Sequence, residues 1–133
     1  SLTVFRNKFC YVMLNLYPYN SGHLMIIPNR HVSDIHDLGE NEMNEMMQTV
    51  LLSMKALDAC MKPQGYNYGA NIGKAAGAGI DSHLHFHVVP RWSGDINFMP
   101  AIGEVKIISQ DLLVTKKSLI KSFNEILNSK AKL

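Results

Sequence analysis

The chain has 133 residues, of which 47% are hydrophobic and 18% are charged, and its formal net charge at pH 7 is +2. This composition excludes the disordered, collagen-like and disulfide-dense classes of protein, and the small charge excludes the concentrated basic surface that nucleic-acid binding needs. A chain of this length folds as one domain with a substantial core, so residues 1–133 are expected to form a single domain.

Two features of the sequence bear on its location. Its apolar runs are far shorter than the roughly 20 residues of a membrane-spanning helix, and its N-terminus has neither a start methionine nor the regions of a signal peptide. The two cysteines, Cys10 and Cys60, stand far apart and form no CxxC motif, so neither a redox pair nor a zinc knuckle is indicated. We therefore expect a cytoplasmic protein that binds neither membranes nor nucleic acids.

The first half of the chain predicts a β-hairpin followed by a long helix. Residues 9–15 and 23–28 are rich in strand-forming residues and are separated by a turn-forming stretch that contains Pro18 and Gly22. From residue 40 to residue 62, apolar side chains recur every three or four positions, as in an amphipathic helix that buries one face. The positions expected on that buried face are Met43, Met46, Met47, Val50, Met54, Leu57 and Met61.

The second half predicts three further strands, one of them at residues 83–89, and a second helix. Residues 66–72 can form a strand that leads into a glycine-rich loop at 73–79, and residues 105–108 are predicted as a short strand. Ser109 or Asp111 is the expected cap of the second helix. The side chains expected on the buried side of that helix are Leu112, Leu113, Leu119, Ile120, Phe123, Ile126 and Leu127.

Three histidines occupy alternate positions of residues 83–89, which follow the glycine-rich loop. Successive side chains of a strand point to opposite faces, so His83, His85 and His87 would project from one face of a strand at this place. The residues between them, which would enter the core, are Leu84, Phe86 and Val88.

A row of imidazoles beside a glycine-rich loop can be interpreted in three ways. A neutral imidazole can attack phosphorus while its neighbours donate to phosphate oxygens or to the leaving group, with backbone N–H groups of the loop holding the phosphate. Alternatively, the histidines could bind a metal ion, which needs a further ligand such as Asp81, or they could simply face solvent. Three histidines at a period of two beside the loop favour phosphate chemistry.

The sequence at 83–89 fits the signature His-φ-His-φ-His-φ-φ, where φ is apolar, and on this motif the chain resembles the histidine triad (HIT) superfamily. Asn15, residues 21–23, residues 71–73 and residues 90–98 are similar to further landmarks of the superfamily and occur in the same order. The strings NLYPYNSGH and HVVPRW-x-GD-x-NF resemble the bacterial branch related to diadenosine tetraphosphate phosphorylases and to Fhit-type dinucleoside polyphosphate hydrolases.

The resemblance implies an α+β fold. An antiparallel sheet of about five strands would pack against one long helix and a C-terminal helix, and the sheet would extend across a homodimer. Many members of this branch carry an extra segment before the position of Ser1, so we expect an N-terminal segment to be missing from this chain.

The resemblance also implies an enzyme that cleaves dinucleoside polyphosphates, such as diadenosine tri- or tetraphosphate, at the α-phosphate. His85 would be the nucleophile and would form a covalent nucleotidyl-imidazole intermediate. His87 would donate to the bridging oxygen or to a phosphate oxygen, His83 would orient the nucleophile, and His23 would complete the network from the neighbouring strand. No cofactor and no metal held by the histidines is implied, although the substrate can be used as its complex with a divalent metal.

A nucleotide-binding set is implied around the triad. Asn15 would hold the ribose hydroxyls, although its position also suits a strand-end asparagine that bonds its own turn. The Gly-Gln-Ser or Gly-Gln-Thr of the family is replaced by Gly-Ile-Asp-Ser at 79–82, so backbone N–H groups, Ser82 or Asn71 must hold the phosphates. Trp92 is a candidate platform for a base, or a packing residue. The full set is Asn15, Asn71, Gly73, Gly77, Gly79, Ile80, Ser82 and Trp92.

Several alternatives stay open from the sequence. The acceptor of the nucleotidyl group is either water or inorganic phosphate, because a hydrolase and a phosphorylase can share the same residues. A Hint-like nucleoside phosphoramidase is the alternative enzyme, and a low-turnover nucleotide-binding protein or a metal-binding protein is the alternative outside enzymes. The two remaining histidines, His31 and His36, are interpreted as surface residues.

Overall fold

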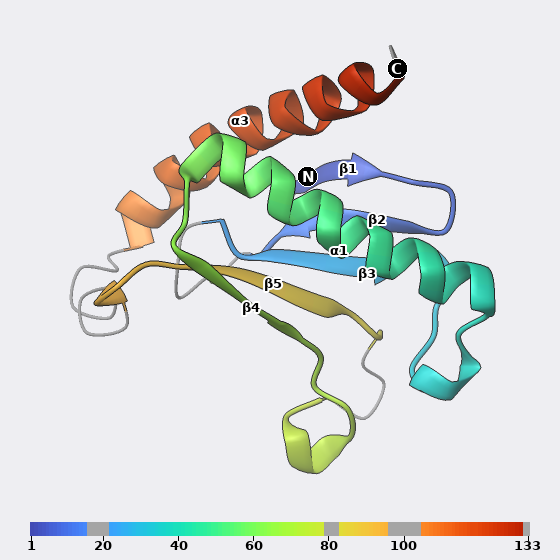
Figure 1. The fold of residues 1–133 in the computed structure, drawn as a ribbon. Coiled ribbons are helices and arrows are strands. Elements are labelled where there is room, and N and C mark those ends of the chain that lie inside the picture. The colour runs from blue at the N-terminus through green and yellow to red at the C-terminus, as the bar shows by residue number, and fades with distance from the viewer. Residues whose placement is uncertain (16–21, 79–82, 96–104, 132–133) are drawn as a thin grey trace.

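The computed structural model describes residues 1–15, 22–78, 83–95 and 105–131 of the chain. Five strands form an antiparallel sheet in the order β1-β2-β3-β5-β4, and two long helices, α1 and α3, pack side by side on one face of it (Figure 1). The predicted α+β fold is therefore confirmed. The elements are β1 (Thr3–Arg6), β2 (Cys10–Leu14), β3 (Leu24–Pro28), the 3-10 helix η1 (Ile35–Asp37), α1 (Glu40–Met61), β4 (Gly65–Gly69), the 3-10 helix η2 (Lys74–Ala76), β5 (Phe86–Arg91) and α3 (Val105–Ala131).

The predicted hairpin corresponds to β2 and β3. These strands pair in register from Cys10 opposite Pro28 to Leu14 opposite Leu24. Alternate residues of β2 are fully buried, and Cys10 Sγ lies 3.4 Å from Thr49 Oγ1 of α1. This alternation is what makes the segment a strand with one face against the helices. Residues 16–21, which include most of the predicted turn, lie outside the described residues.

The edge strand β1 is an element that the sequence pattern does not predict. It has four residues, and its register with β2 is irregular between Thr3 and Phe5. Phe5 stacks on Phe123 of α3, with ring centroids 4.9 Å apart and ring planes 6° apart. A short strand with a register shift shows too little alternation to be detected, and contacts distant in the sequence stabilise it.

The long helix α1 matches the prediction to within one residue. It ends at Met61 because Lys62 adopts the left-handed conformation, with φ of 50°. Met46 is fully buried as expected, but Met43 is 45% exposed and Met47 is 38% exposed, so the prediction that they belong to the core is wrong. The apolar stripe on the helix is wider than the face that the sheet covers.

The C-terminal helix α3 begins earlier than predicted, at Val105. The predicted strand at 105–108 is therefore wrong, and neither Ser109 nor Asp111 caps the helix. β-branched residues favour strands locally, but Val105, Ile108 and Leu112 continue the helical period of the apolar positions.

Most of the predicted buried side of α3 is confirmed. Leu112, Leu119 and Phe123 are buried, and Ile120 and Ile126 are partly buried against the same core. Leu113 is 62% exposed and Leu127 is 37% exposed, so these two predictions are wrong. The helix presents only a narrow stripe to β1 and α1, and both residues lie beyond its edges. Among the described residues, no helix combines the length and the apolar character needed to cross a membrane.

Candidate active site

The triad lies at the start of β5, where the strand enters the middle of the sheet. Regular pairing begins at Phe86, so His83, Leu84 and His85 precede the strand, and the prediction of a strand from residue 83 is wrong by three residues. The alternation nevertheless holds, because Leu84 and Val88 are buried and Phe86 is partly buried against the core, while all three histidines are half-buried. The histidines therefore face away from the helices, as expected for side chains of opposite parity.

The ring of His85 is oriented by the main chain of its neighbour. His85 Nδ1 lies 2.9 Å from the carbonyl oxygen of His83. A carbonyl oxygen can only accept, so Nδ1 carries the hydrogen and Nε2 of the neutral ring carries the lone pair. The structure thus presents His85 in the tautomer that a nucleophile attacking through Nε2 requires.

A hydrogen-bonded chain fixes the ring of His87. Asn15 Nδ2 lies 3.1 Å from His23 Nδ1, and His23 Nε2 lies 2.8 Å from His87 Nδ1. The amide nitrogen can only donate, so His23 Nδ1 accepts, its Nε2–H donates to His87 Nδ1, and neutral His87 carries its hydrogen on Nε2. This series of hydrogen bonds therefore makes His87 a hydrogen-bond donor at Nε2, the ring nitrogen that does not contact His23.

Two of these histidines are held in the neutral form. His23 is 8% exposed, and burial, together with the nearby His87 and His85, lowers its pKa from 6.5 to about 4. Burial and the neighbouring His85 also lower the pKa of His87. The rings of His85 and His87 meet edge to face, with centroids 4.7 Å apart. Near pH 7, His23 and His87 therefore act through directional N–H groups rather than through positive charge.

His83 occupies the outer end of the row. Its Nε2 lies 3.1 Å from the carbonyl oxygen of Arg30, and its ring lies 4.7 Å from the ring of His31. His31 is exposed as predicted. Its contact with the triad was not predicted, because the only sequence signal was its position shortly after a strand. His36 is exposed and pairs with Asp34 at 3.0 Å.

The glycine-rich loop leaves the sheet beside the triad. Gly69, the last residue of β4, is the register partner of His87. Gly73 and Gly77 flank η2 with φ of 86° and 102°, and Asn71 Nδ2 lies 3.7 Å from where a Cβ of Gly77 would stand. Positive φ suits glycine and allows the loop to fold tightly on Asn71. Their contact with phosphate stays a prediction, and Gly79, Ile80 and Ser82 lie outside the described residues.

Trp92 follows β5 at the end of the strand away from the triad. Its backbone N–H donates to Asp95 Oδ2 at 3.0 Å, and Arg91 Nε donates to the same carboxylate at 2.9 Å. Five residues of strand correspond to about 16 Å, so the structure does not bring Trp92 to His87 within one chain. Its predicted contact with a base stays a prediction. In the described part of the chain, no three His, Cys, Asp or Glu side chains are placed to hold a metal ion.

Comparison with known proteins gives consistent results. The family model of the HIT domain matches residues 1–94. The chain is 46% identical over 118 residues to the AP-4-A phosphorylase of Mycobacterium tuberculosis, covering 89% of this chain and 60% of that protein. It is 33% identical over 91 residues to the adenosine 5'-monophosphoramidase of Saccharomyces cerevisiae, covering 68% of this chain and 54% of that protein. The chain thus spans only 54–60% of the length of these curated relatives.

The fold is also similar to that of solved structures. A hypothetical histidine triad nucleotide-binding protein from Sulfolobus tokodaii superposes with a TM-score of 0.79. The two sequences are 27% identical, and the match covers 94% of this chain and 85% of the other.

Proposed function

The chain belongs to the HIT domain family, and from that premise we propose that it cleaves dinucleoside polyphosphates at the α-phosphate through a nucleotidyl group carried on His85. The observation that carries the proposal is the hydrogen bond from His85 Nδ1–H to the His83 carbonyl oxygen, at 2.9 Å. It leaves the lone pair on Nε2, which is what a nucleophilic imidazole needs.

In the first step, His85 Nε2 forms a bond to the α-phosphorus and the bond from that phosphorus to the bridging oxygen breaks. From diadenosine tetraphosphate the leaving group is ATP. His87 Nε2–H donates a hydrogen bond to the bridging oxygen as that oxygen gains charge, and the chain from Asn15 through His23 holds this donor in place. Backbone N–H groups around Gly73 and Gly77 hold the phosphates.

In the second step, an acceptor oxygen attacks the same phosphorus and the bond from phosphorus to His85 Nε2 breaks. Water yields AMP and inorganic phosphate yields ADP, and either product restores the free imidazole. The mycobacterial relative, which is named a phosphorylase, supports inorganic phosphate as the acceptor. The two free cysteines, Cys10 and Cys60, support a cytoplasmic location for this reaction.

Product analysis tests the proposal directly. Purified protein is incubated with diadenosine tetraphosphate, with and without inorganic phosphate, and the nucleotides are separated. ATP with ADP, formed only when phosphate is present, supports phosphorolysis, whereas ATP with AMP in its absence supports hydrolysis. Failure to release any nucleotide under both conditions would overturn the proposal.

A nucleoside phosphoramidase is the second candidate, because the yeast relative is named for that activity. The same His85 attack would expel an amine, which needs a proton more than a polyphosphate does. Comparison of kcat/KM for adenosine 5'-phosphoramidate and diadenosine tetraphosphate separates the two functions. A clearly higher value for the phosphoramidate would favour the second candidate.

We also propose that the functional unit is a homodimer. Strand β4 lies at one edge of the sheet, where Tyr68 is 56% exposed, and an outer face of α1 presents Met43, Met47 and Leu51 at four-residue spacing. An open strand edge and an apolar helix face are surfaces that a second copy can cover. Light scattering should give twice the chain mass for the wild type and a lower mass for Met47→Lys, whereas a monomeric wild type would contradict the proposal.

A further inference from the structure

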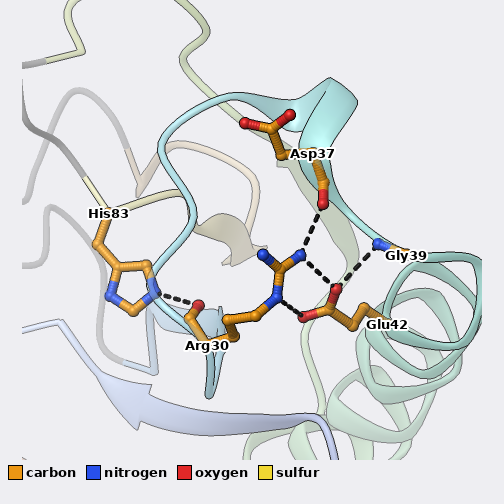
Figure 2. A network of polar contacts seen from close by, with 5 residues as sticks. All are labelled: Arg30, Asp37, Gly39, Glu42 and His83. Carbon is orange, nitrogen blue, oxygen red and sulfur yellow. Dashed lines mark hydrogen bonds and ion pairs between the residues drawn. The ribbon is translucent and has the colours of Figure 1, made fainter.

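A polar network outside the reacting groups holds the first residue of the triad (Figure 2). His83 Nε2–H donates to the carbonyl oxygen of Arg30 at 3.1 Å. The side chain of the same Arg30 turns toward α1, where Nη2 donates to Glu42 Oε1 at 2.8 Å and Nε donates to Glu42 Oε2 at 3.3 Å. Arg30 therefore contacts the triad through its main chain and the helix through its side chain.

The helix end of this network is well anchored. Glu42, in the first turn of α1, also accepts the backbone N–H of the N-cap residue Gly39 at 2.9 Å, and Arg30 Nη2 also donates to the carbonyl oxygen of Asp37 at 2.6 Å (Figure 2). The side chain of Glu42 is 11% exposed and that of Arg30 is 56% exposed. A nearly buried carboxylate keeps a fixed geometry when both of its oxygens accept from a guanidinium and one of them, here Oε1, also accepts a backbone N–H. The guanidinium is thus held by the start of a long helix rather than by a free loop.

The triad end of the network has two connections to the same loop. Besides the contact between His83 and Arg30, the backbone N–H of Leu84 donates to the carbonyl oxygen of Val32 at 2.7 Å. The carbonyl oxygen of His83 in turn accepts from His85 Nδ1–H at 2.9 Å. A shift of residues 30–32 would therefore be transmitted through His83 to the ring of His85.

We propose that Arg30 is a positioning residue for the triad: its ion pair with Glu42 fixes the carbonyl that holds His83, and His83 in turn fixes the orientation of His85. This inference rests on the proposed function for its kinetic consequences, but the placement of the rings can be measured separately. His83 is not paired with a neighbouring strand, because in the described residues the regular pairing of β5 begins only at Phe86. The loop therefore supplies the order that a strand supplies to His87.

Substitution of Arg30 tests the role of the side chain, because the backbone carbonyl that His83 contacts is retained. Arg30→Gln should lower kcat for diadenosine tetraphosphate about tenfold, as expected for a small displacement of a reacting group, with KM changed less than about twofold. Arg30→Lys, which keeps the charge, should recover part of the loss. Glu42→Gln removes the negative charge from the ion pair. Its control, Glu40→Gln, makes the same charge change at an exposed position of the same helical turn and should leave kcat unchanged.

A double-mutant cycle separates positioning from general stability. In a His83→Ala background, Arg30→Gln should cause no further fall in kcat, because its effect passes through His83. If the two losses multiply instead, or if Arg30→Gln alone leaves kcat unchanged, the proposal is wrong. Should Arg30→Gln fold poorly, Glu42→Gln, which keeps the shape of its side chain, is assayed in the same cycle and is judged by the same outcomes.

Nitrogen-15 NMR of the histidine rings provides a readout that does not need turnover. In the wild type, the His85 signals should correspond to a hydrogen fixed on Nδ1, and Arg30→Gln should produce a mixture of tautomers while the His87 signals stay unchanged. Unchanged His85 signals would overturn the positioning role. If the wild type fails to cleave diadenosine tetraphosphate but its His85 signals respond to Arg30→Gln, the proposed function fails and the positioning role stands.

Discussion

The two outer histidines of the triad, His83 and His87, are held in opposite ways. His87 lies within a paired strand and bonds to His23, a side chain that is 8% exposed and is itself fixed by Asn15. His83 precedes the strand and bonds to a loop carbonyl, and an ion pair at the start of α1 holds that loop. The sheet end therefore holds His87 through a series of side chains, whereas the loop end holds His83, and through its carbonyl oxygen the ring of His85, by main-chain contacts.

Because the two histidines are held differently, perturbations at the two ends should alter different properties of the enzyme. A chain of side-chain hydrogen bonds transmits the choice of donor and acceptor, so changes near His87 should affect both turnover and pH dependence. A main-chain contact with a carbonyl has only one possible direction, so changes near Arg30 should affect turnover with little effect on pH dependence. His85, the proposed nucleophile, lies between the two ends and contacts both.

The largest effect should come from the residue between the two ends. His85→Gly removes the attacking nitrogen, so kcat for diadenosine tetraphosphate should fall at least about a thousandfold while the fold is kept. Nucleotide separation after timed incubation measures the loss. His36→Gly, at an exposed histidine outside the site, is the control and should keep wild-type turnover. Retention of full activity by His85→Gly would remove His85 from the mechanism.

A smaller effect is expected at the sheet end from loss of the donor. His87→Leu should lower kcat about a hundredfold, because the bridging oxygen loses the hydrogen bond that stabilises its developing charge. His87→Gln, which keeps an N–H donor, should lose less. Equal losses in the two variants, measured by the same assay, would indicate that His87 acts through packing rather than through hydrogen bonding.

Removal of the first donor in the chain should have a weaker effect. Asn15→Leu keeps the size of the side chain but leaves His23 Nδ1 without its amide donor, so the hydrogens of His23 and His87 are no longer fixed. We expect kcat to fall about tenfold, as for partial loss of a positioned proton donor. The pH–rate profile should change in shape, in contrast to that of Arg30→Gln. Profiles of the same shape for both variants would erase the distinction between the two ends.

The pH dependence of unfolding should report on the sheet end alone, through the buried neutral ring of His23. The pKa of His23 falls from 6.5 to about 4 on folding, so between these values the unfolded chain binds more protons than the folded chain. This contribution to stability is fully present above pH 6.5 and is lost as the pH falls toward 4, by an amount on the order of 3 kcal/mol. Denaturant unfolding from pH 7 to pH 4 should show a shallower decline for His23→Gln than for the wild type. Identical slopes would contradict the buried neutral state of His23.

The periodic features of the molecule could be predicted from the sequence. The alternation at 83–89, the hairpin and α1 depend on side chains a few residues apart, and their patterns are long enough to detect. The tertiary contacts could not be predicted. β1 depends on the stacking of Phe5 on Phe123, and the network at His83 joins Arg30 to Glu42 across a loop, so neither leaves a local pattern.

The residues of the candidate site could be predicted from the sequence, but the hydrogen bonds between them could not. The hairpin register places Asn15 beside His23, because Asn15 N–H donates to the His23 carbonyl oxygen at 2.9 Å, but which atom of Asn15 contacts His23 follows only from the folded geometry. The start of α3 was missed because β-branched residues in its first turn have a local preference that the rest of the helix overrides.

Detection of the covalent intermediate tests the proposed role of His85 without reference to turnover rates. Wild-type protein is mixed with diadenosine tetraphosphate without phosphate, quenched in alkaline denaturant, and analysed by intact-mass and tandem mass spectrometry. The mechanism predicts a mass increase of one adenylyl group on His85, absent from His85→Gly and discharged as ADP when phosphate is added before the quench. Turnover with no nucleotide bound to the protein, or an adduct on any other residue, would contradict it.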